Sequence, residues 1–118
     1  DYSLFDGSVE TIVFTERKRS RLKNVTFIKL AFDEDLINNL FLELRKHKIN
    51  SVLVEGGKEL LQSLIDRGLW DETSVETSSV YFEGGIEAHY IEGFVLDECD
   101  WGASRQRHLA SGDNYKII

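Results

Sequence analysis

Residues 51–72, SVLVEGGKELLQSLIDRGLWDE, form the segment that most constrains what this chain can fold into. The short apolar run at residues 52–54 predicts a strand, and the leucine-rich stretch after the glycines has helical spacing. Gly56 and Gly57 leave the turn between them without side chains, so a phosphate could approach exposed N–H groups at the positive end of the helix dipole. The segment predicts a strand–turn–helix unit with a nucleotide or phosphate site at the turn, and Glu55 lies at its mouth.

The composition sets the broad class of protein. A chain of 118 residues, 42% of them hydrophobic, is expected to form a single domain over residues 1–118 with one core. Its net charge of −7 argues against a general nucleic-acid binder or a protein of anionic membrane surfaces. No apolar run approaches the ~18 residues that a membrane span requires. The single Cys99 excludes an internal disulfide and favours a reducing, cytoplasmic compartment.

The chain before this segment predicts two strands and a helix. Residues 10–15 and 25–30 are rich in β-branched and aromatic side chains, and a basic loop at 16–23 lies between them. Asp33 is a candidate N-cap for a helix over residues 34–48. Its apolar side chains repeat at helical spacing, namely Leu36, Ile37, Leu40, Phe41 and Leu44.

The chain after the glycine pair predicts a second helix and then further strands. The helix covers residues 58–67, presents Leu60, Leu61, Leu64 and Ile65 on one face, and ends at Gly68, a typical left-handed C-cap. Residues 73–80, after Asp71 and Glu72, read as a strand, residues 81–118 as an antiparallel part, and 115–118 as a closing strand. Short connections between strands and helices imply parallel crossovers, hence an α/β sheet with Glu55, Gly56 and Gly57 beyond a strand's carboxyl end.

The motifs VLVEGG and GLWDE, with an apolar helix between them, resemble the reductase domain of the bifunctional riboflavin-biosynthesis protein RibD, a relative of dihydrofolate reductase. The resemblance implies a dihydrofolate-reductase-like mixed sheet of mostly parallel strands with flanking helices and an antiparallel C-terminal part. The family's Lys and Ser-Leu-Asp-Gly segment is not found in this sequence. Neither is the zinc signature of its deaminase half, since the chain has no proline and one cysteine. We therefore expect the chain to be the C-terminal part of such a reductase domain, and hence an incomplete domain.

The resemblance also implies an activity and a set of site residues. The activity is the NADPH-dependent reduction of the ribose of 5-amino-6-(5-phosphoribosylamino)uracil to the ribityl chain. By resemblance, Gly56 and Gly57 would bind the cofactor's pyrophosphate through backbone N–H groups, with Lys58 opening the helix. Glu55 would be the catalytic residue, a carboxylate that faces the substrate ribose or the nicotinamide. The expected partners are this small molecule and a second copy of the chain in a homodimer, with no nucleic acid and no membrane.

Other interpretations of the same residues stay open. The glycine pair is also compatible with a plain tight turn, and Glu55 with an exposed charge at a helix N-terminus. The basic run from Arg17 to Lys23 could contact the 2′-phosphate of NADPH or form a solvated loop. The three histidines lack metal spacing, so no metal site is expected. The alternative functions are a pterin reductase of the dihydrofolate-reductase type, a non-catalytic nucleotide-binding or dimerisation module, and an unrelated α/β phosphate-binding domain.

Overall fold

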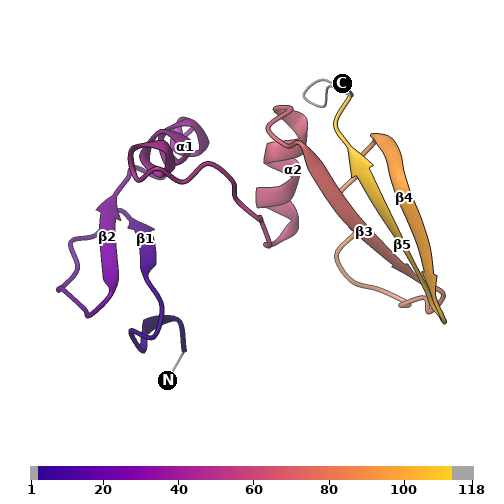
Figure 1. Ribbon diagram of the computed structural model, residues 1–118, viewed down its shortest axis with the longest axis horizontal. Helices are drawn as coiled ribbons and strands as arrows, with labels where there is room; N and C mark the ends of the chain where they lie inside the picture. The colour runs from indigo at the N-terminus through magenta and orange to yellow at the C-terminus, as the bar shows by residue number, and fades with distance from the viewer. Residues whose placement is uncertain (1–2, 113–118) are drawn as a thin grey trace. The chain divides into compact units, whose positions relative to one another are not determined.

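The computed structural model describes residues 3–112, which fall into two compact units within Asp1–Val52 and Leu53–Ile118 (Figure 1). The prediction of a single domain over residues 1–118 stays a prediction. Within the described residues, no helix is long and apolar enough to cross a membrane.

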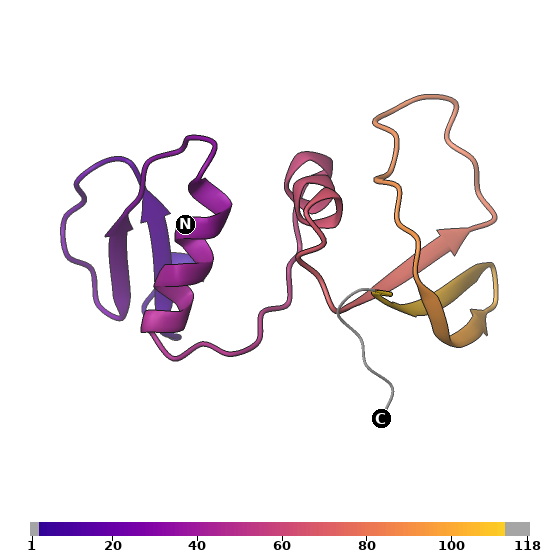
Figure 2. The ribbon, with the colours of Figure 1, turned by 90° about the horizontal axis from the view of Figure 1, so that it is seen from above.

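The first unit holds a two-stranded parallel sheet and one helix (Figures 1 and 2). Its elements are the 3-10 helix η1 (Ser3–Phe5), β1 (Thr11–Thr15), β2 (Val25–Lys29) and α1 (Leu36–Lys46). Thr11 pairs with Val25, and the register continues without a shift to the ends of both strands. Val25 and Ile37 are the buried apolar residues of this unit, and the rest of the apolar face of α1 is half-buried. The parallel pairing of the first two predicted strands and the inward face of the helix agree with the sequence pattern.

The second unit holds one helix and a three-stranded antiparallel sheet. Its elements are α2 (Lys58–Asp66), β3 (Glu72–Ser78), β4 (Phe94–Trp101) and β5 (Ser104–Ala110), with strand order β3-β5-β4. A two-residue turn joins β4 to β5, and its Gly102 has the positive φ of 61° that such hairpins require. Leu64 of α2 is buried, as are Leu109 and Ala110 at the end of β5.

Gly93 is a position where only glycine fits this unit. A β-carbon there would lie 2.5 Å from the Ala110 carbonyl oxygen and 2.9 Å from the Trp70 ring. Trp70 therefore packs against the backbone where β4 begins.

Three expectations about the fold need correction. Residues 51–54 do not form a strand: they belong to an extended segment without regular structure, and Leu53 is 87% exposed. An apolar run becomes a strand only where a neighbouring segment accepts its backbone hydrogen bonds, and no described strand pairs with this one. The prediction of one sheet with mostly parallel strands is also wrong. The strands form two sheets, of which β1-β2 is parallel and β3-β5-β4 is antiparallel. The helix predicted over residues 34–48 is shorter, Leu36–Lys46, and its N-cap is Asp35 instead of Asp33.

Other boundaries agree more closely. The helix predicted from Lys58 begins there, and Gly68 has the expected left-handed conformation with φ 64°. The strand predicted over residues 73–80 corresponds to β3, which covers Glu72–Ser78. The C-terminal part is antiparallel as expected, whereas the predicted closing strand at 115–118 lies outside the described residues. The structure is a mixed α/β arrangement, with which a dihydrofolate-reductase-like fold is consistent.

Candidate cofactor site at the start of helix α2

The predicted site residues Glu55, Gly56, Gly57 and Lys58 lie together where the chain enters α2, inside the second unit (Figure 1). All four are exposed. Gly57 is the N-cap, with extended backbone angles of φ −72° and ψ 166°, and no side chain caps the helix. The first backbone hydrogen bond of α2 runs from the Leu61 N–H to the Gly57 carbonyl oxygen, at 3.2 Å. The preceding N–H groups of the first turn therefore point out of the helix toward any bound acceptor.

The two glycines are not equivalent. A β-carbon at Gly56 would lie 3.0 Å from the end of the Leu60 side chain, so this glycine allows close packing of the turn on the helix. A β-carbon at Gly57 would meet nothing within 4 Å. The space above Gly57 is open, and its φ is one that any residue adopts. Folding therefore does not demand glycine at position 57, whereas close approach of a ligand to the backbone would.

Side-chain charge around the turn is mixed. Lys58 places its Nζ 3.9 Å from Glu87 Oε2, and both side chains are substantially exposed. Glu59 lies in the first turn, and Glu55 makes no ion pair or hydrogen bond with another described residue. Because the acidic groups outnumber Lys58, an anion here would be held mainly by backbone N–H groups and the helix dipole.

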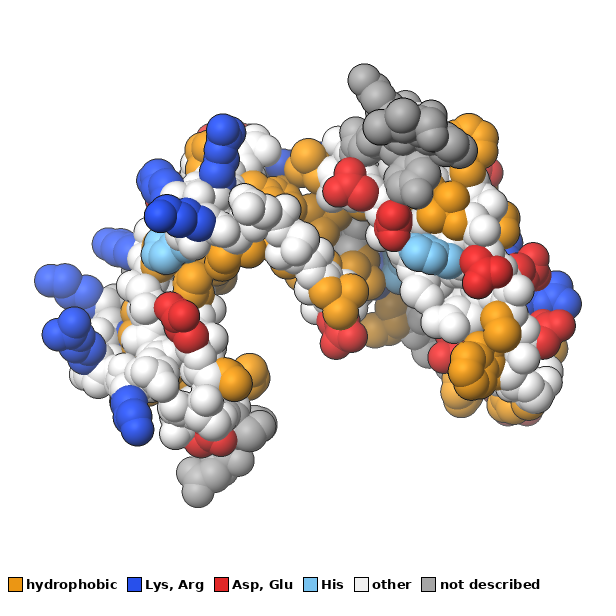
Figure 3. All heavy atoms as spheres, viewed as in Figure 1, with side chains coloured by type: hydrophobic (Ala, Val, Ile, Leu, Met, Phe, Trp, Pro, Cys, Tyr) orange, Lys and Arg blue, Asp and Glu red, His pale blue; other side chains and the backbone are white. Residues whose placement is uncertain are grey.

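The basic run belongs to the first unit. Its Lys and Arg side chains are exposed in the connection between β1 and β2, and Figure 3 shows cationic side chains gathered over this unit. The unit holds nine Lys and Arg against eight Asp and Glu, whereas the second unit holds five against thirteen. Glu16 is engaged elsewhere, since its carboxylate accepts the Phe32 N–H at 2.9 Å. Within residues 3–112 no ion pair joins the run to a carboxylate, and its contact with a 2′-phosphate stays a prediction.

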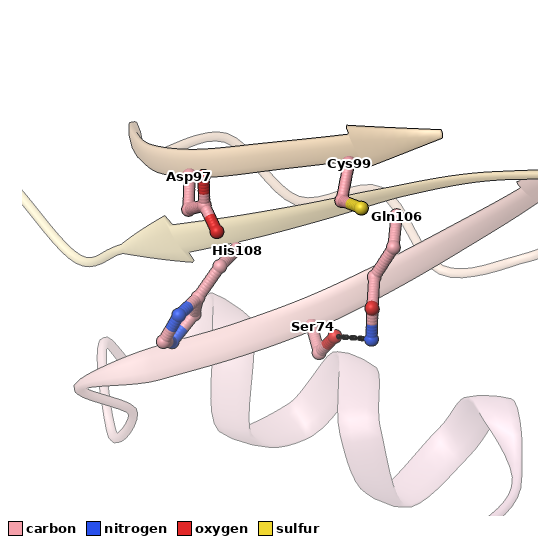
Figure 4. A pocket seen from close by; sticks show the side chains of 5 residues that line it. All are labelled: Ser74, Asp97, Cys99, Gln106 and His108. Carbon is pink, nitrogen blue, oxygen red and sulfur yellow. Dashed lines mark hydrogen bonds between the residues drawn. The ribbon is translucent and has the colours of Figure 1, made fainter. Parts of the chain in front are cut away.

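A second polar site was missed by reasoning from the sequence. A shallow recess of about 260 Å³ lies on one face of the antiparallel sheet, lined by Ser74, Asp97, Cys99, Gln106 and His108 (Figure 4). Gln106 donates to the Ser74 hydroxyl at 2.8 Å, and His108 Nε2 lies 2.9 Å from Glu72 Oε2. Alternation along β5 hints at a polar face, but the cross-strand register that joins these residues cannot be read from one sequence.

The recess does not form a metal centre. Within residues 3–112, no group of three or more His, Cys, Asp or Glu side chains is placed to hold a metal ion. The Glu72 carboxylate of β3 pairs with His108 of the neighbouring strand β5. The recess therefore offers hydrogen bonds on an exposed sheet face.

The fold and the open helix N-terminus together define a mixed α/β protein with a turn suited to a phosphate group. The family model of the RibD C-terminal domain matches residues 1–89 of the chain. The chain therefore belongs to the RibD C-terminal domain family, the reductase domain of riboflavin biosynthesis, and its role in the full-length protein is that of an oxidoreductase. The match includes α2 and its glycine pair and ends in the connection between β3 and β4. No curated protein matches the chain.

Proposed function

We propose that this chain supplies the pyrophosphate-binding part of an NADPH site in a riboflavin-biosynthesis reductase. The reaction is the reduction of the ribose of 5-amino-6-(5-phosphoribosylamino)uracil to the ribityl chain. The observation that carries the proposal is the N-terminus of α2, where Gly57 leaves open space over uncapped N–H groups. Family membership supports the reaction class.

Each residue of the turn has a distinct role in this proposal. The Gly57 and Lys58 N–H groups donate to pyrophosphate oxygens, and Gly56 lets the turn pack on Leu60. The positively charged Lys58 ammonium attracts the same phosphate. Glu55, exposed and without a described partner, orients a substrate hydroxyl or relays its proton. The nicotinamide would supply the hydride, and the chain supplies binding and orientation.

The wider setting is also proposed. A free, exposed Cys99 suits a reducing cytoplasm. Exposed apolar side chains such as Tyr81, Phe82 and Ile86, with 94%, 87% and 88% of their surface accessible, favour association with a second copy of the chain. A dimerisation module without chemistry is the second candidate function, and the same exposed side chains favour it.

Substitutions at the two helix N-caps test the cofactor site in the full-length protein. Gly57→Ala should weaken NADPH binding by about tenfold or more, because the methyl group occupies the space that the pyrophosphate needs. Thermal stability should stay unchanged, since the backbone angles suit alanine and nothing lies within 4 Å. Asp35→Ala at the N-cap of α1 is the matched control and should leave NADPH affinity unchanged. Fluorescence titration with NADPH provides the measurement.

A charged variant separates the two candidate functions. Gly57→Asp should cap α2 and raise or maintain its stability, while its carboxylate repels the pyrophosphate and takes the N–H groups. Stability and affinity then move in opposite directions. Equal NADPH affinity in wild type, Gly57→Ala and Gly57→Asp would remove the glycine turn from the cofactor site, and no binding by the wild type would favour the dimerisation module.

A further inference from the structure

The connection between β3 and β4, residues 79–93, runs without helix or strand and is mostly exposed. Its first residue, Ser79, donates its N–H to the Ala103 carbonyl oxygen at 2.9 Å, and Gly93 packs against Trp70 at its other end. Between these ends, two polar contacts join the middle of the connection to α2. One joins Glu87 to Lys58, and the other joins Tyr90 to Gln62. The helix that begins at the glycine pair therefore holds the middle of this connection.

Gln62 makes the firmer of the two contacts. Its Oε1 accepts the Tyr90 N–H at 3.1 Å, and its Nε2 lies 3.5 Å from the Tyr90 carbonyl oxygen. Nε2 also donates to Asp66 Oδ1 at 2.7 Å, one helical turn further along α2. Because a carboxylate accepts hydrogen bonds and cannot donate them, Asp66 fixes which end of the Gln62 amide faces the Tyr90 N–H. The side chain is thus oriented on α2 before it pairs with the connection.

Lys58 and Gln62 lie four residues apart, so they occupy one face of α2. Along that face they contact Glu87 and Tyr90, three residues apart in the connection. The Lys58–Glu87 pair is exposed and 3.9 Å long, so it adds little by itself. The hydrogen bonds of Gln62 are therefore the main polar restraint that keeps Glu87 beside the first turn of the helix.

We propose that Gln62 is a positioning residue for the cofactor site. It holds the β3–β4 connection against α2, so that one side of the phosphate-binding turn is formed before a ligand arrives. This inference rests on the proposed function, since it takes the turn at Gly57 as the place where NADPH binds. Without Gln62, ligand binding must also order the connection, and that cost appears as weaker binding with little change in the chemical step.

The test compares two Gln62 variants with a matched control in the full-length protein. Gln62→Met keeps the size of the side chain and removes its hydrogen bonds, and Gln62→Ala removes both. Ser63→Ala is the control, because among the residues that the structure describes the Ser63 hydroxyl bonds only the Leu60 carbonyl oxygen of the same helix, at 3.0 Å. Both Gln62 variants should raise KM for NADPH by about three- to tenfold, the effect of losing one or two ordinary hydrogen bonds, with kcat changed less than about twofold. Ser63→Ala should change neither.

Hydrogen exchange at the Tyr90 amide tests the contact without reference to activity. Exchange should quicken by about tenfold in Gln62→Met and stay at the wild-type rate in Ser63→Ala. An unchanged rate in Gln62→Met would overturn the inference, and so would faster exchange with an unchanged KM. If Tyr90 exchange quickens but the wild-type protein itself fails to bind NADPH, the proposed function is at fault and Gln62 positions the connection for another purpose.

Discussion

Helices α1 and α2 are each followed, two residues after their last residue, by a residue with a left-handed backbone. It is Lys48 after α1, with φ 59°, and Gly68 after α2, with φ 64°. The hydrogen bonds are the same in both. Lys48 N–H donates to the Arg45 carbonyl oxygen at 2.9 Å, as Gly68 N–H does to Ile65 at 3.0 Å. In each case the next residue along the chain donates to the carbonyl four positions before the left-handed residue. This Schellman arrangement is a demand of the backbone, met without strain by glycine and at some cost by lysine.

The same two helices begin differently. Before α1 the chain reads Asp33-Glu34-Asp35, and these carboxylates surround the helix start. Asp33 is already used, since its carboxylate accepts the Asp35 N–H at 3.0 Å and its carbonyl accepts the Leu36 N–H at 3.1 Å. Before α2 stand Glu55 and two glycines, and neither N-cap residue, Asp35 or Gly57, makes a side-chain cap hydrogen bond. Acidic side chains stand near both helix starts, but the two glycines before α2 let a ligand approach its backbone N–H groups closely. The beginnings of the helices, and not their ends, therefore distinguish structure from candidate function.

The largest effect is expected when one carboxylate before each helix is converted to its amide. Glu55→Gln should lower kcat by about 100-fold in the full-length enzyme if Glu55 relays a proton, with KM for NADPH little changed. Asp33→Asn should leave kcat within about twofold, because asparagine keeps an oxygen for the Asp35 N–H. Steady-state kinetics of both variants gives the comparison. Equal activity of Glu55→Gln and wild type would remove the catalytic role of Glu55 and leave the glycine turn as a binding element alone.

The contrast between the helices also shows how far the sequence could lead. Helical spacing and Gly68 located α2 within one residue at each end, because apolar periodicity and a glycine C-cap are local signals. The end of α1 was placed two residues late, since Lys48 gives no local sign of a left-handed conformation. The apolar run at residues 52–54 predicts a strand that the structure does not form, because strand formation depends on a partner elsewhere in the chain.

The candidate site was predictable for the same reason that α2 was. Glu55, Gly56, Gly57 and Lys58 are consecutive, so the turn that holds them could be recognised from their order. The contact of Gln62 with Tyr90 and the pairing of Glu72 with His108 join residues 28 and 36 positions apart. Such contacts follow from packing and register, which a single sequence does not contain.

A smaller effect is expected when the left-handed residue that follows each helix is replaced. Gly68→Ala should lower the free energy of unfolding by about 1 kcal/mol, because a β-carbon is strained at positive φ. Nothing lies within 4 Å of that β-carbon, so the loss reports backbone strain alone. Lys48→Gly should raise stability by about 0.5 kcal/mol, the relief of strain being partly offset by the entropy of glycine in the unfolded chain.

Urea denaturation measures both changes, and Lys48→Ala controls for the lost charge at the end of α1. That variant keeps a β-carbon at φ 59° and should gain nothing. If Lys48→Gly and Lys48→Ala prove equally stable, the strain at Lys48 is negligible and the two helix ends are equivalent in energy as well as in geometry.

The smallest effect concerns the segments to which the side chains of the two helices are hydrogen-bonded. In α1 the side-chain bonds of Lys46 and His47 return to Glu43, within and beside the helix, whereas α2 reaches the β3–β4 connection through Gln62. In that connection the Tyr90 hydroxyl donates to the Glu92 carboxylate. This hydrogen bond, with slight burial and the negative charge of Glu92, raises the pKa of Tyr90 above its ordinary value.

A raised pKa in the folded state means that the Tyr90–Glu92 bond is fully present below the ordinary tyrosine pKa of about 10 and is lost as pH rises through the higher folded value. Difference absorbance of tyrosinate, wild type minus Tyr90→Phe, should therefore show one tyrosine that titrates late. Glu92→Gln should bring that titration back toward the ordinary value, since a neutral amide no longer disfavours the phenolate. Exchange of the Tyr90 amide should quicken over the same high-pH step, beyond the general rise with hydroxide, while the amides of α1 follow the general rise alone. A titration that Glu92→Gln leaves unmoved would show that Glu92 does not hold the hydroxyl, and Gln62 would then be the main side-chain restraint on Tyr90.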